Sequence, residues 1–292
     1  MTMINSTVIM SGADYFANDQ QINPYYAEED VNVAQAITEH GEIQRLLTEA
    51  GVNVIKVGAP SDSQDGVYTA NWALVGGGKA VLARLPDARK SEEEHARGVL
   101  EAQGIEVINV PEGLKFSGQG DALPCGDYLF CGSGYRSDEA AQEFAAEQLG
   151  YKRIQLRTVP QLDEAGQPVI NATSGWADSF YYDIDLALSI IKGPSEGSLG
   201  TIAYCREAFT PESQQILDDL QGFDKILISE TEAKQAFACN LVSTGEHVVM
   251  SGNAPEFKAE LEKRGLTVKS PQITELVKGG GYIRCTTLSL NP

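Results

Sequence analysis

A short unit of sequence recurs five times along this chain of 292 residues. Each copy contains apolar residues at helical spacing, then a glycine, then a short run rich in β-branched residues. The five glycines are Gly51, Gly104, Gly150, Gly222 and Gly265, and they are separated by 53, 46, 72 and 43 residues. A glycine suits the left-handed cap at the end of a helix. Spacings of this size indicate a repeat architecture.

Strand-like sequence precedes each of the five helices. Three of these stretches are predicted to be hairpins, with turns at residues 76–78, 125–127 and 244–246. Each unit is therefore roughly a hairpin, a helix and a return strand. Five units closing on a ring predict an α/β propeller with five-fold pseudosymmetry, with helices outside and strand ends meeting at the axis. A doubly wound parallel sheet would need single strands between helices, and an all-β propeller would lack the helices.

The organisation predicted from this repeat is one domain over residues 1–292. Its units lie at about 1–60, 61–112, 113–160, 161–232 and 233–292, and no low-complexity tract or linker separates them. The longest unit contains a polar stretch with glycine and proline at 161–178, which we expect to be a loop over one face of the ring.

The charge balance is strongly acidic, with 41 acidic and 22 basic residues and a net charge of −19. Nucleic-acid binding needs a basic face, so the composition argues against it, whereas an acidic cleft would steer cations inward. No stretch has the roughly 18 consecutive apolar residues of a membrane span. The first residues lack the basic segment of a signal peptide. We therefore expect a cytoplasmic protein that binds neither nucleic acid nor membranes.

The five cysteines are odd in number and form no CxxC pair. We expect reduced thiols, with four of them in strand cores: Cys125, Cys131, Cys205 and Cys239. The three histidines, at 40, 95 and 247, are too scattered to make a metal site with them, so no metal is predicted. We interpret these histidines as surface, turn or helix residues.

Several short motifs follow one another along nearly the whole chain. They are INP at 22–24, DGVYTAN at 65–71, SEEEH at 91–95, FSGQGDAL at 116–123, GSGYRS at 132–137, YYDID at 181–185, ACN at 238–240 and GGGYIRCTTL at 279–288. In this order and at this spacing they resemble the pentein superfamily. More narrowly, they are similar to the group of dimethylarginine dimethylaminohydrolases, arginine deiminases and amidinotransferases.

This resemblance implies a cysteine nucleophile that attacks the amidine carbon of a guanidinium group and forms a covalent adduct. Cys285 matches the nucleophile, and we expect the glycine run before it to expose the thiol at a strand end. Such chemistry needs a thiolate, carboxylates that hold the planar cation, and a general acid/base. The guanidinium itself can be the cation that favours the thiolate.

The substrate-binding positions follow from the same resemblance. Asp185 matches the guanidinium-binding aspartate of the family's His-x-Asp element, and Asn71 stands where some members have a second such aspartate. Arg136 matches an arginine that holds the substrate's carboxylate or orders the entrance. Asp65 falls near the amino-acid end of the substrate. For Asp121 we consider both a substrate role and a structural role in the lining of the ring.

Two positions depart from the family pattern. Asp183 replaces the histidine of His-x-Asp, and Ser117 replaces the glutamate that binds the guanidinium or orients that histidine. Asp183 and Asp185 are two residues apart, so on a strand they would share one face. Two close carboxylates raise the pKa of one of them. Asp183 could then act as the proton shuttle, or it could mark lost activity.

Three functions remain open at this point. The first is a cysteine-dependent hydrolase of an arginine-like small molecule, with Cys285 and Asp183 as catalytic residues. The second is an amidinotransferase, and the third is a catalytically impaired protein that binds a guanidino compound. All three have a guanidino or ureido small molecule as partner and need no organic cofactor. The resemblance is also compatible with a homodimer.

Overall fold

The computed structural model describes residues 3–292, and its strands form five separate three-stranded sheets. In each sheet the middle strand pairs antiparallel with one neighbour and parallel with the other. The strands are β1 Thr7–Met10, β2 Asn53–Lys56 and β15 Leu288–Ser289; β3 Ala73–Gly76, β4 Lys79–Leu82 and β5 Glu106–Asn109; β6 Ala122–Cys125, β7 Tyr128–Ser133 and β8 Lys152–Arg157; β9 Leu188–Lys192, β10 Gly200–Tyr204 and β11 Phe223–Leu227; and β12 Val242–Ser243, β13 His247–Val249 and β14 Thr267–Lys269.

A helix connects the middle strand of each sheet to its parallel neighbour. These helices are α1 Val33–Glu49, α2 Ser91–Ala102, α3 Glu139–Leu149, α4 Pro211–Asp219 and α6 Pro255–Lys263. The five predicted glycines lie between helix and strand with φ of 87°, 75°, 78°, 84° and 83°, so the left-handed conformation is confirmed for all of them. A short further helix, α5 Glu230–Ala236, was not predicted.

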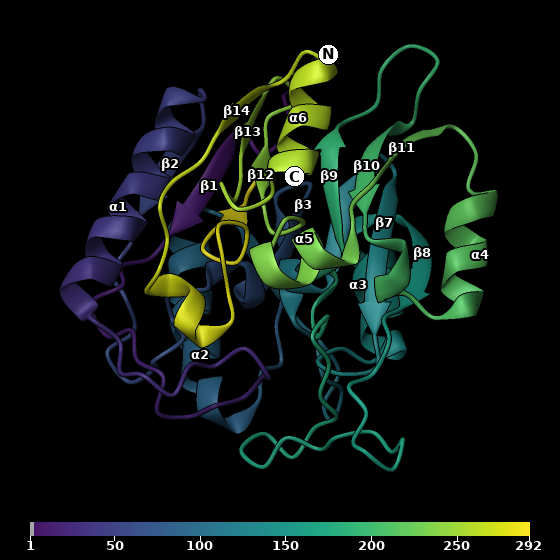
Figure 1. Cartoon of the computed structure of the whole chain (residues 1–292). Coiled ribbons are helices and arrows are strands. Elements are labelled where there is room, and N and C mark those ends of the chain that lie inside the picture. Colours follow the sequence, from purple (N-terminus) through teal and green to yellow (C-terminus); the bar gives the residue numbers. More distant parts are fainter. Residues whose placement is uncertain (1–2) are drawn as a thin grey trace.

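The three predicted hairpins are confirmed as β3–β4, β6–β7 and β12–β13. The fourth sheet also has an antiparallel pair, β9–β10. The first sheet takes its antiparallel strand from the other end of the chain, because Ile9 of β1 pairs with Leu288 of β15. The two ends of the chain therefore meet in one sheet, and both lie in the upper half of Figure 1.

The apolar core lies between the sheets and the helices. Strands such as β3 and β10 are buried along their whole length, and helices such as α1 and α4 lie on the outside of the strands in Figure 1. Burial along the whole length explains why the sequences of such strands are almost continuously apolar, whereas β2 and β5 have exposed polar residues at both ends. Within residues 3–292 no helix is long and apolar enough to cross a membrane.

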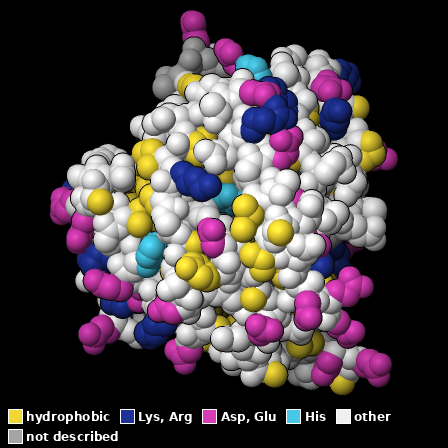
Figure 2. Space-filling view, turned by 90° about the vertical axis from the view of Figure 1, so that its left-hand side faces the viewer, with side chains coloured by type: hydrophobic (Ala, Val, Ile, Leu, Met, Phe, Trp, Pro, Cys, Tyr) yellow, Lys and Arg dark blue, Asp and Glu magenta, His cyan; other side chains and the backbone are white. Residues whose placement is uncertain are grey.

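The surface carries the excess of acidic residues without a single large acidic patch on the face drawn in Figure 2. Asp and Glu side chains are spread around that face and mixed with Lys and Arg. The stretch 161–178 forms no helix or strand, only two isolated bridges, as expected for a loop. In Figure 1 it extends from the end of the molecule opposite the chain termini.

Candidate active site

Five short turns carry the candidate site residues. Each turn precedes the strand that pairs antiparallel with the middle strand of its sheet. Their residues are Asn71 before β3, Ser117 and Asp121 before β6, Asp183 and Asp185 before β9, Asn240 before β12, and Cys285 before β15. Three of these turns are 3-10 helices, at Thr69–Trp72, Gly118–Gly120 and Ile184–Leu186. The repeat thus places equivalent segments of all five units together.

The thiol of Cys285 is held by two neighbouring turns. Asn240 Nδ2 donates to Cys285 Sγ at 3.1 Å, and Asn240 Oδ1 accepts from the backbone N–H of Cys285 at 3.1 Å. The thiol in turn contacts Asp185 Oδ2 at 3.5 Å. Cys285 is only 3% exposed, so the expectation of an exposed thiol is wrong. The turn points the thiol into the molecule, toward these two residues.

The glycine run before Cys285 allows close packing. Gly280 has a φ of 85°, and a Cβ on Gly281 would lie 2.3 Å from Tyr68 Cε1. Tyr68 donates its hydroxyl proton to Leu276 O at 2.5 Å, which ties the segment before the nucleophile to the second unit. No larger residue fits this approach, so the run is needed to place Cys285.

Asp183 lies in an extended conformation immediately before a 3-10 turn that contains Asp185. The prediction that both belong to one strand face is therefore wrong, because β9 begins only at Leu188. Asn71 Nδ2 donates to Asp183 Oδ2 at 2.8 Å and to Ser117 Oγ at 2.9 Å. Gly120 makes room for this contact, since a Cβ there would lie 2.6 Å from Asp183 Oδ2.

Three buried carboxyl groups lie near one another at the site. Each leaves one oxygen without a hydrogen bond to any described residue: Asp121 Oδ2, Asp183 Oδ1 and Asp185 Oδ1. Burial raises the pKa of each, and the charge of Asp183 further raises the pKa values of Asp121 and Asp185. Asp121 also accepts from the backbone N–H of Ile184 at 2.9 Å. A cation entering this cluster would relieve both the repulsion and the missing hydrogen bonds.

The pKa of Cys285 is raised well above its usual value, first by burial and then by Asp185 and Asp183. Without a cation beside it, this sulfur is therefore a neutral thiol near pH 7. An added positive charge would lower the pKa of Cys285 and so favour the thiolate.

A small cavity opens on Cys285 and is bordered by the remaining predicted residues. Its lining includes Tyr26, Asp65, Asn71, Arg136, Tyr182 and Cys285. The guanidinium of Arg136 stacks on the Tyr182 ring at 4.0 Å and donates to Ile22 O at 3.0 Å. Both oxygens of Asp65 accept from Tyr26 Oη at 2.7 Å. Burial raises the pKa of Asp65 to about 6, although Arg89 opposes the rise.

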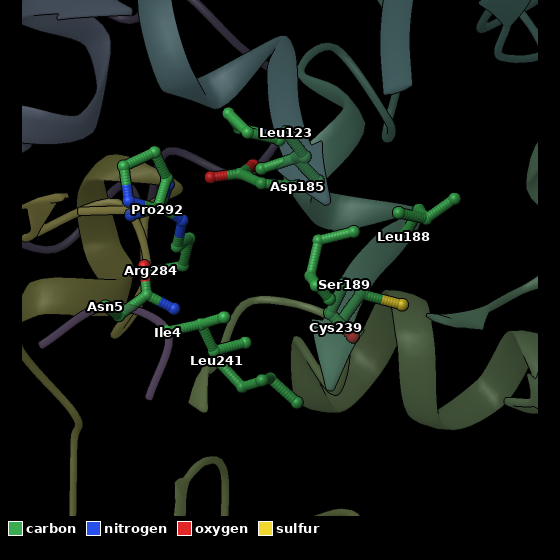
Figure 3. Close-up of a pocket in the computed structure, with 12 residues that line it drawn as sticks. Ile4, Asn5, Leu123, Asp185, Leu188, Ser189, Cys239, Leu241, Arg284 and Pro292 are labelled. Atoms are coloured by element: carbon green, nitrogen blue, oxygen red, sulfur yellow. The ribbon is translucent and has the colours of Figure 1, made fainter. Parts of the chain in front are cut away.

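A second cavity lies near the two ends of the chain. Figure 3 shows Asp185 and Arg284 in its lining together with Asn5, Ser189, Leu241 and Pro292. Asp185 therefore borders this cavity while its carboxylate contacts the thiol of Cys285.

The histidines take no part in the site. His95 bonds to Gly58 O at 2.9 Å, His247 lies on β13, and His40 is buried on α1 with its pKa lowered to about 4 by burial. All five cysteines are free and buried. The described part of the chain contains no cluster of three or more His, Cys, Asp or Glu side chains suited to a metal ion.

Sequence reasoning missed two contributors to this geometry. Asn240 was part of the ACN motif but had no role assigned, although it occupies the same place before β12 as Asn71 does before β3. Arg89 was not singled out at all. A comparison of equivalent positions in the five units could have found Asn240, whereas no sequence signal indicated Arg89.

Comparison with known proteins agrees with this architecture. The family model for N,N dimethylarginine dimethylhydrolase, eukaryotic, matches residues 10–173. The chain is 30% identical over 287 residues to the N(G),N(G)-dimethylarginine dimethylaminohydrolase of Mycobacterium tuberculosis, covering 97% of this chain and 85% of that protein. The chain belongs to the dimethylarginine dimethylaminohydrolase family, within the pentein superfamily.

More distant relatives include a two-function protein. The chain is 26% identical over 287 residues to the bifunctional arginine dihydrolase/ornithine cyclodeaminase ArgZ of Synechocystis, covering 96% of this chain but only 37% of that protein. The solved N-terminal domain of ArgZ bound to substrate has a TM-score of 0.84 and 26% identity, with 98% of each chain covered. A dimethylarginine dimethylaminohydrolase adduct with S-methyl-L-thiocitrulline has a TM-score of 0.72 at 17% identity and shares the fold.

Proposed function

We propose that this protein is a cysteine-dependent hydrolase that cleaves a C–N bond in the guanidino group of arginine or an arginine-like small molecule. The observation that carries the proposal is the cluster of buried carboxyl groups around Cys285, each with an unpaired oxygen. Guanidinium is a planar cation with five N–H donors, so it matches several carboxylates at once. The relatives that act on dimethylarginine and arginine support the same substrate class.

The binding step also supplies the nucleophile. A guanidinium group beside Asp185 would lower the pKa of Cys285, and the thiol proton would move to the Asp183 carboxylate. The thiolate then forms a bond to the amidine carbon, and the bond from that carbon to the leaving nitrogen breaks. Asp183 returns its proton to that nitrogen, which departs as a neutral amine or ammonia. A reaction intermediate covalently bound to an ArgZ variant supports an adduct of this kind.

Water completes the reaction by attacking the same carbon. Asp183 accepts one proton from the water, the C–S bond breaks, and the proton of the added hydroxyl passes to the sulfur as the neutral ureido product forms. Asp183 then releases its proton to solvent or to the departed amine. In this proposal Asp183 takes the part of the family's histidine, and Asn71 and Ser117 stabilise its ionised form. Asp121 and Asn71 border the cation, and Arg136 and Asp65 lie toward the amino-acid end. We also infer that the five units close into one ring over residues 1–292.

The test is product analysis with arginine, methylated arginines, agmatine and guanidinoacetate, combined with mass spectrometry of Cys285. We expect release of ammonia or an alkylamine, a Cys285 adduct, and loss of both in Cys285→Ala. Turnover that survives in Cys285→Ala would show that the reaction centre lies elsewhere. Binding of arginine without turnover or adduct would instead favour the impaired binding protein, which the raised pKa of the buried thiol also supports.

A further inference from the structure

A buried arginine lies directly beside the nucleophile in the sequence. Arg284 is only 6% exposed and comes immediately before Cys285. Arg284 and Asp185 both line the cavity near the two ends of the chain (Figure 3). Because the thiol of Cys285 contacts Asp185 Oδ2 at 3.5 Å, these three residues form one contiguous group.

The guanidinium of Arg284 is held in a defined position by neutral partners. Arg284 Nη1 donates to Thr287 O at 2.9 Å and to Thr287 Oγ1 at 3.3 Å, and Nη2 donates to Gln119 Oε1 at 2.9 Å. Gln119 is fixed in turn, because its amide exchanges hydrogen bonds with the backbone N–H and C=O groups of Ser289 at 2.9 and 2.8 Å. Every hydrogen bond that the guanidinium makes with residues 3–292 therefore goes to an uncharged acceptor.

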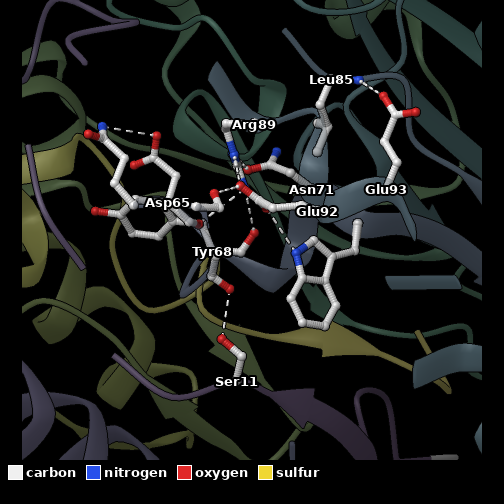
Figure 4. A network of polar contacts seen from close by, with 12 residues as sticks. Ser11, Asp65, Tyr68, Asn71, Leu85, Arg89, Glu92 and Glu93 are labelled. Atoms are coloured by element: carbon white, nitrogen blue, oxygen red, sulfur yellow. Dashed lines mark hydrogen bonds and ion pairs between the residues drawn. The ribbon is translucent and has the colours of Figure 1, made fainter. Parts of the chain in front are cut away.

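The charge of Arg284 differs in this respect from the charge of Arg89, which lines the cavity that opens on Cys285. Arg89 Nη2 lies 2.7 Å from Glu92 Oε2, and both side chains are buried, so a carboxylate matches the charge of Arg89 directly (Figure 4). The hydrogen bonds of Arg284 include no carboxylate of the described residues. A buried charge without such a partner acts more strongly on its surroundings than it would in water. Asp185 is the acidic side chain in the lining of the cavity that Arg284 shares.

Titratable groups surround Asp185 from several turns. They are Tyr182 and Asp183 on its own segment, Asp121 before β6, Cys239 before β12, and Arg284 and Cys285 before β15. Burial raises the pKa of Asp185 first and the charge of Asp183 raises it further, whereas Arg284 is the cation that lowers it. In the reverse direction, Asp185 favours the charged form of Arg284 against the effect of burial on its pKa.

We infer that Arg284 is a positioning residue: its fixed guanidinium offsets the charge of Asp185 and thereby sets how acidic the solution can become before that carboxylate loses its hold on a guanidino ligand. The inference rests on the proposed function only in giving Asp185 a guanidino group to hold. Its electrostatic part concerns the free protein and can be tested without turnover.

Arg284→Gln removes the charge and leaves a side chain that can still donate a hydrogen bond to Gln119 or Thr287. The pKa of Asp185 then rises further, because the effects of burial and Asp183 are no longer opposed. In NMR we expect the pH midpoint of the Asp185 carboxyl carbon signal, identified by its loss in Asp185→Asn, to rise by about one unit or more. Binding of arginine is measured by calorimetry in Cys285→Ala, so that no ligand is consumed, and should become about tenfold weaker on the acid side of its pH profile.

The alkaline end of the binding profile separates this role from structural damage. Asp185 is ionised there in both proteins, and Arg284→Gln removes a cation that repels the guanidinium, so we expect equal or higher affinity. A general structural effect would weaken binding at every pH. As a matched control, Arg206→Gln removes the same charge from an exposed arginine paired with Asp218 and should move neither the midpoint nor the binding profile.

An unmoved Asp185 midpoint in folded Arg284→Gln, or binding weakened equally at every pH, would overturn the inference. Arg284→Lys is a second variant, which keeps the charge but loses the fork that reaches both Thr287 and Gln119. Its midpoint should stay closer to that of the wild-type protein, and a rise equal to that in Arg284→Gln would show that the charge is not responsible.

If neither variant folds, NMR of the wild-type protein decides. The Nε–H signal of Arg284 should shift with the same pH midpoint as the carboxyl carbon of Asp185, and a signal that does not follow this titration would refute the inference. Turnover of arginine with an unmoved Asp185 midpoint would refute only the role of Arg284. A moved midpoint in a protein that binds arginine without turnover would refute only the hydrolase.

Discussion

Asn240 offers the most direct test of how the protein controls its nucleophile. Its amide donates to Cys285 Sγ at 3.1 Å and accepts from the Cys285 backbone N–H at 3.1 Å. Asn240→Ala removes both bonds, while Asn240→Asp keeps an acceptor for the N–H group and loses the donor to sulfur. The pair of variants therefore separates the two bonds of one side chain.

The expected magnitudes follow from these two bonds. A hydrogen bond to a charged group contributes about 1.5–3 kcal/mol, so its loss raises the pKa of Cys285 and lowers the thiolate population about 10- to 150-fold. The unpaired buried N–H group and the small cavity in Asn240→Ala together reduce the free energy of unfolding by about 2–3 kcal/mol. Asn240→Asp should be less destabilised but at least equally slow, because its carboxylate repels the thiolate.

The rate of Cys285 alkylation by iodoacetamide, in the absence of any arginine analogue, measures the change in thiolate population. Urea unfolding measures the change in the free energy of unfolding. Where a substrate is found, kcat/KM should fall in parallel with the alkylation rate. Folded Asn240→Ala that reacts within threefold of the wild-type rate would show that the amide does not stabilise the thiolate, and the reasoning would fail.

Three further predictions concern other parts of the molecule. Glu39 accepts from the backbone N–H groups of residues 274–276, so Glu39→Gln should lower the free energy of unfolding by about 2–4 kcal/mol in urea titrations. Burial raises the pKa of Asp65 to about 6, so the folded state binds the Asp65 proton more tightly than the unfolded state does. The free energy of unfolding should therefore fall by up to about 3 kcal/mol as the pH rises from about 4 to 6, and Asp65→Asn should flatten this fall in pH-dependent melts. The double change Ser117→Glu with Asp183→His should give a higher kcat/KM than either single change, and equal values would refute a coupled pair.

Much of the fold was predictable because local rules repeat in it. The five glycines must adopt positive φ wherever a helix turns back into a strand, and this requirement leaves a visible mark at each copy. The three hairpins were predictable for a similar reason, because turn residues mark their short turns in the sequence. The pairing of β1 with β15 carries no such local mark, because it joins Val8 to Ser289 and Ile9 to Leu288, at opposite ends of the sequence.

The site was predictable where a motif marked it and not where geometry alone decided. Cys285 and Asp185 do meet, as the resemblance implied. The strand assigned to Asp183 was wrong because period-two spacing cannot distinguish a strand from a 3-10 turn between extended residues. Arg89 escaped notice because its place at the cavity depends on contacts with Glu92 and Asn71, and a single arginine in a sequence gives no sign of its partners.

The two departures from the family pattern become intelligible as one change. Ser117 and Asp183 accept from the same amide nitrogen of Asn71, at 2.9 and 2.8 Å. A glutamate at 117 would set a second carboxylate against Asp183 in a fully buried place, where like charges repel strongly. If Asp183 takes the part of the family's histidine, as we propose, a neutral residue at 117 avoids adding one more carboxylate to the buried cluster around Asp183. Ser117 supplies both neutrality and a hydroxyl, and Asp183 is a group that can hold a proton.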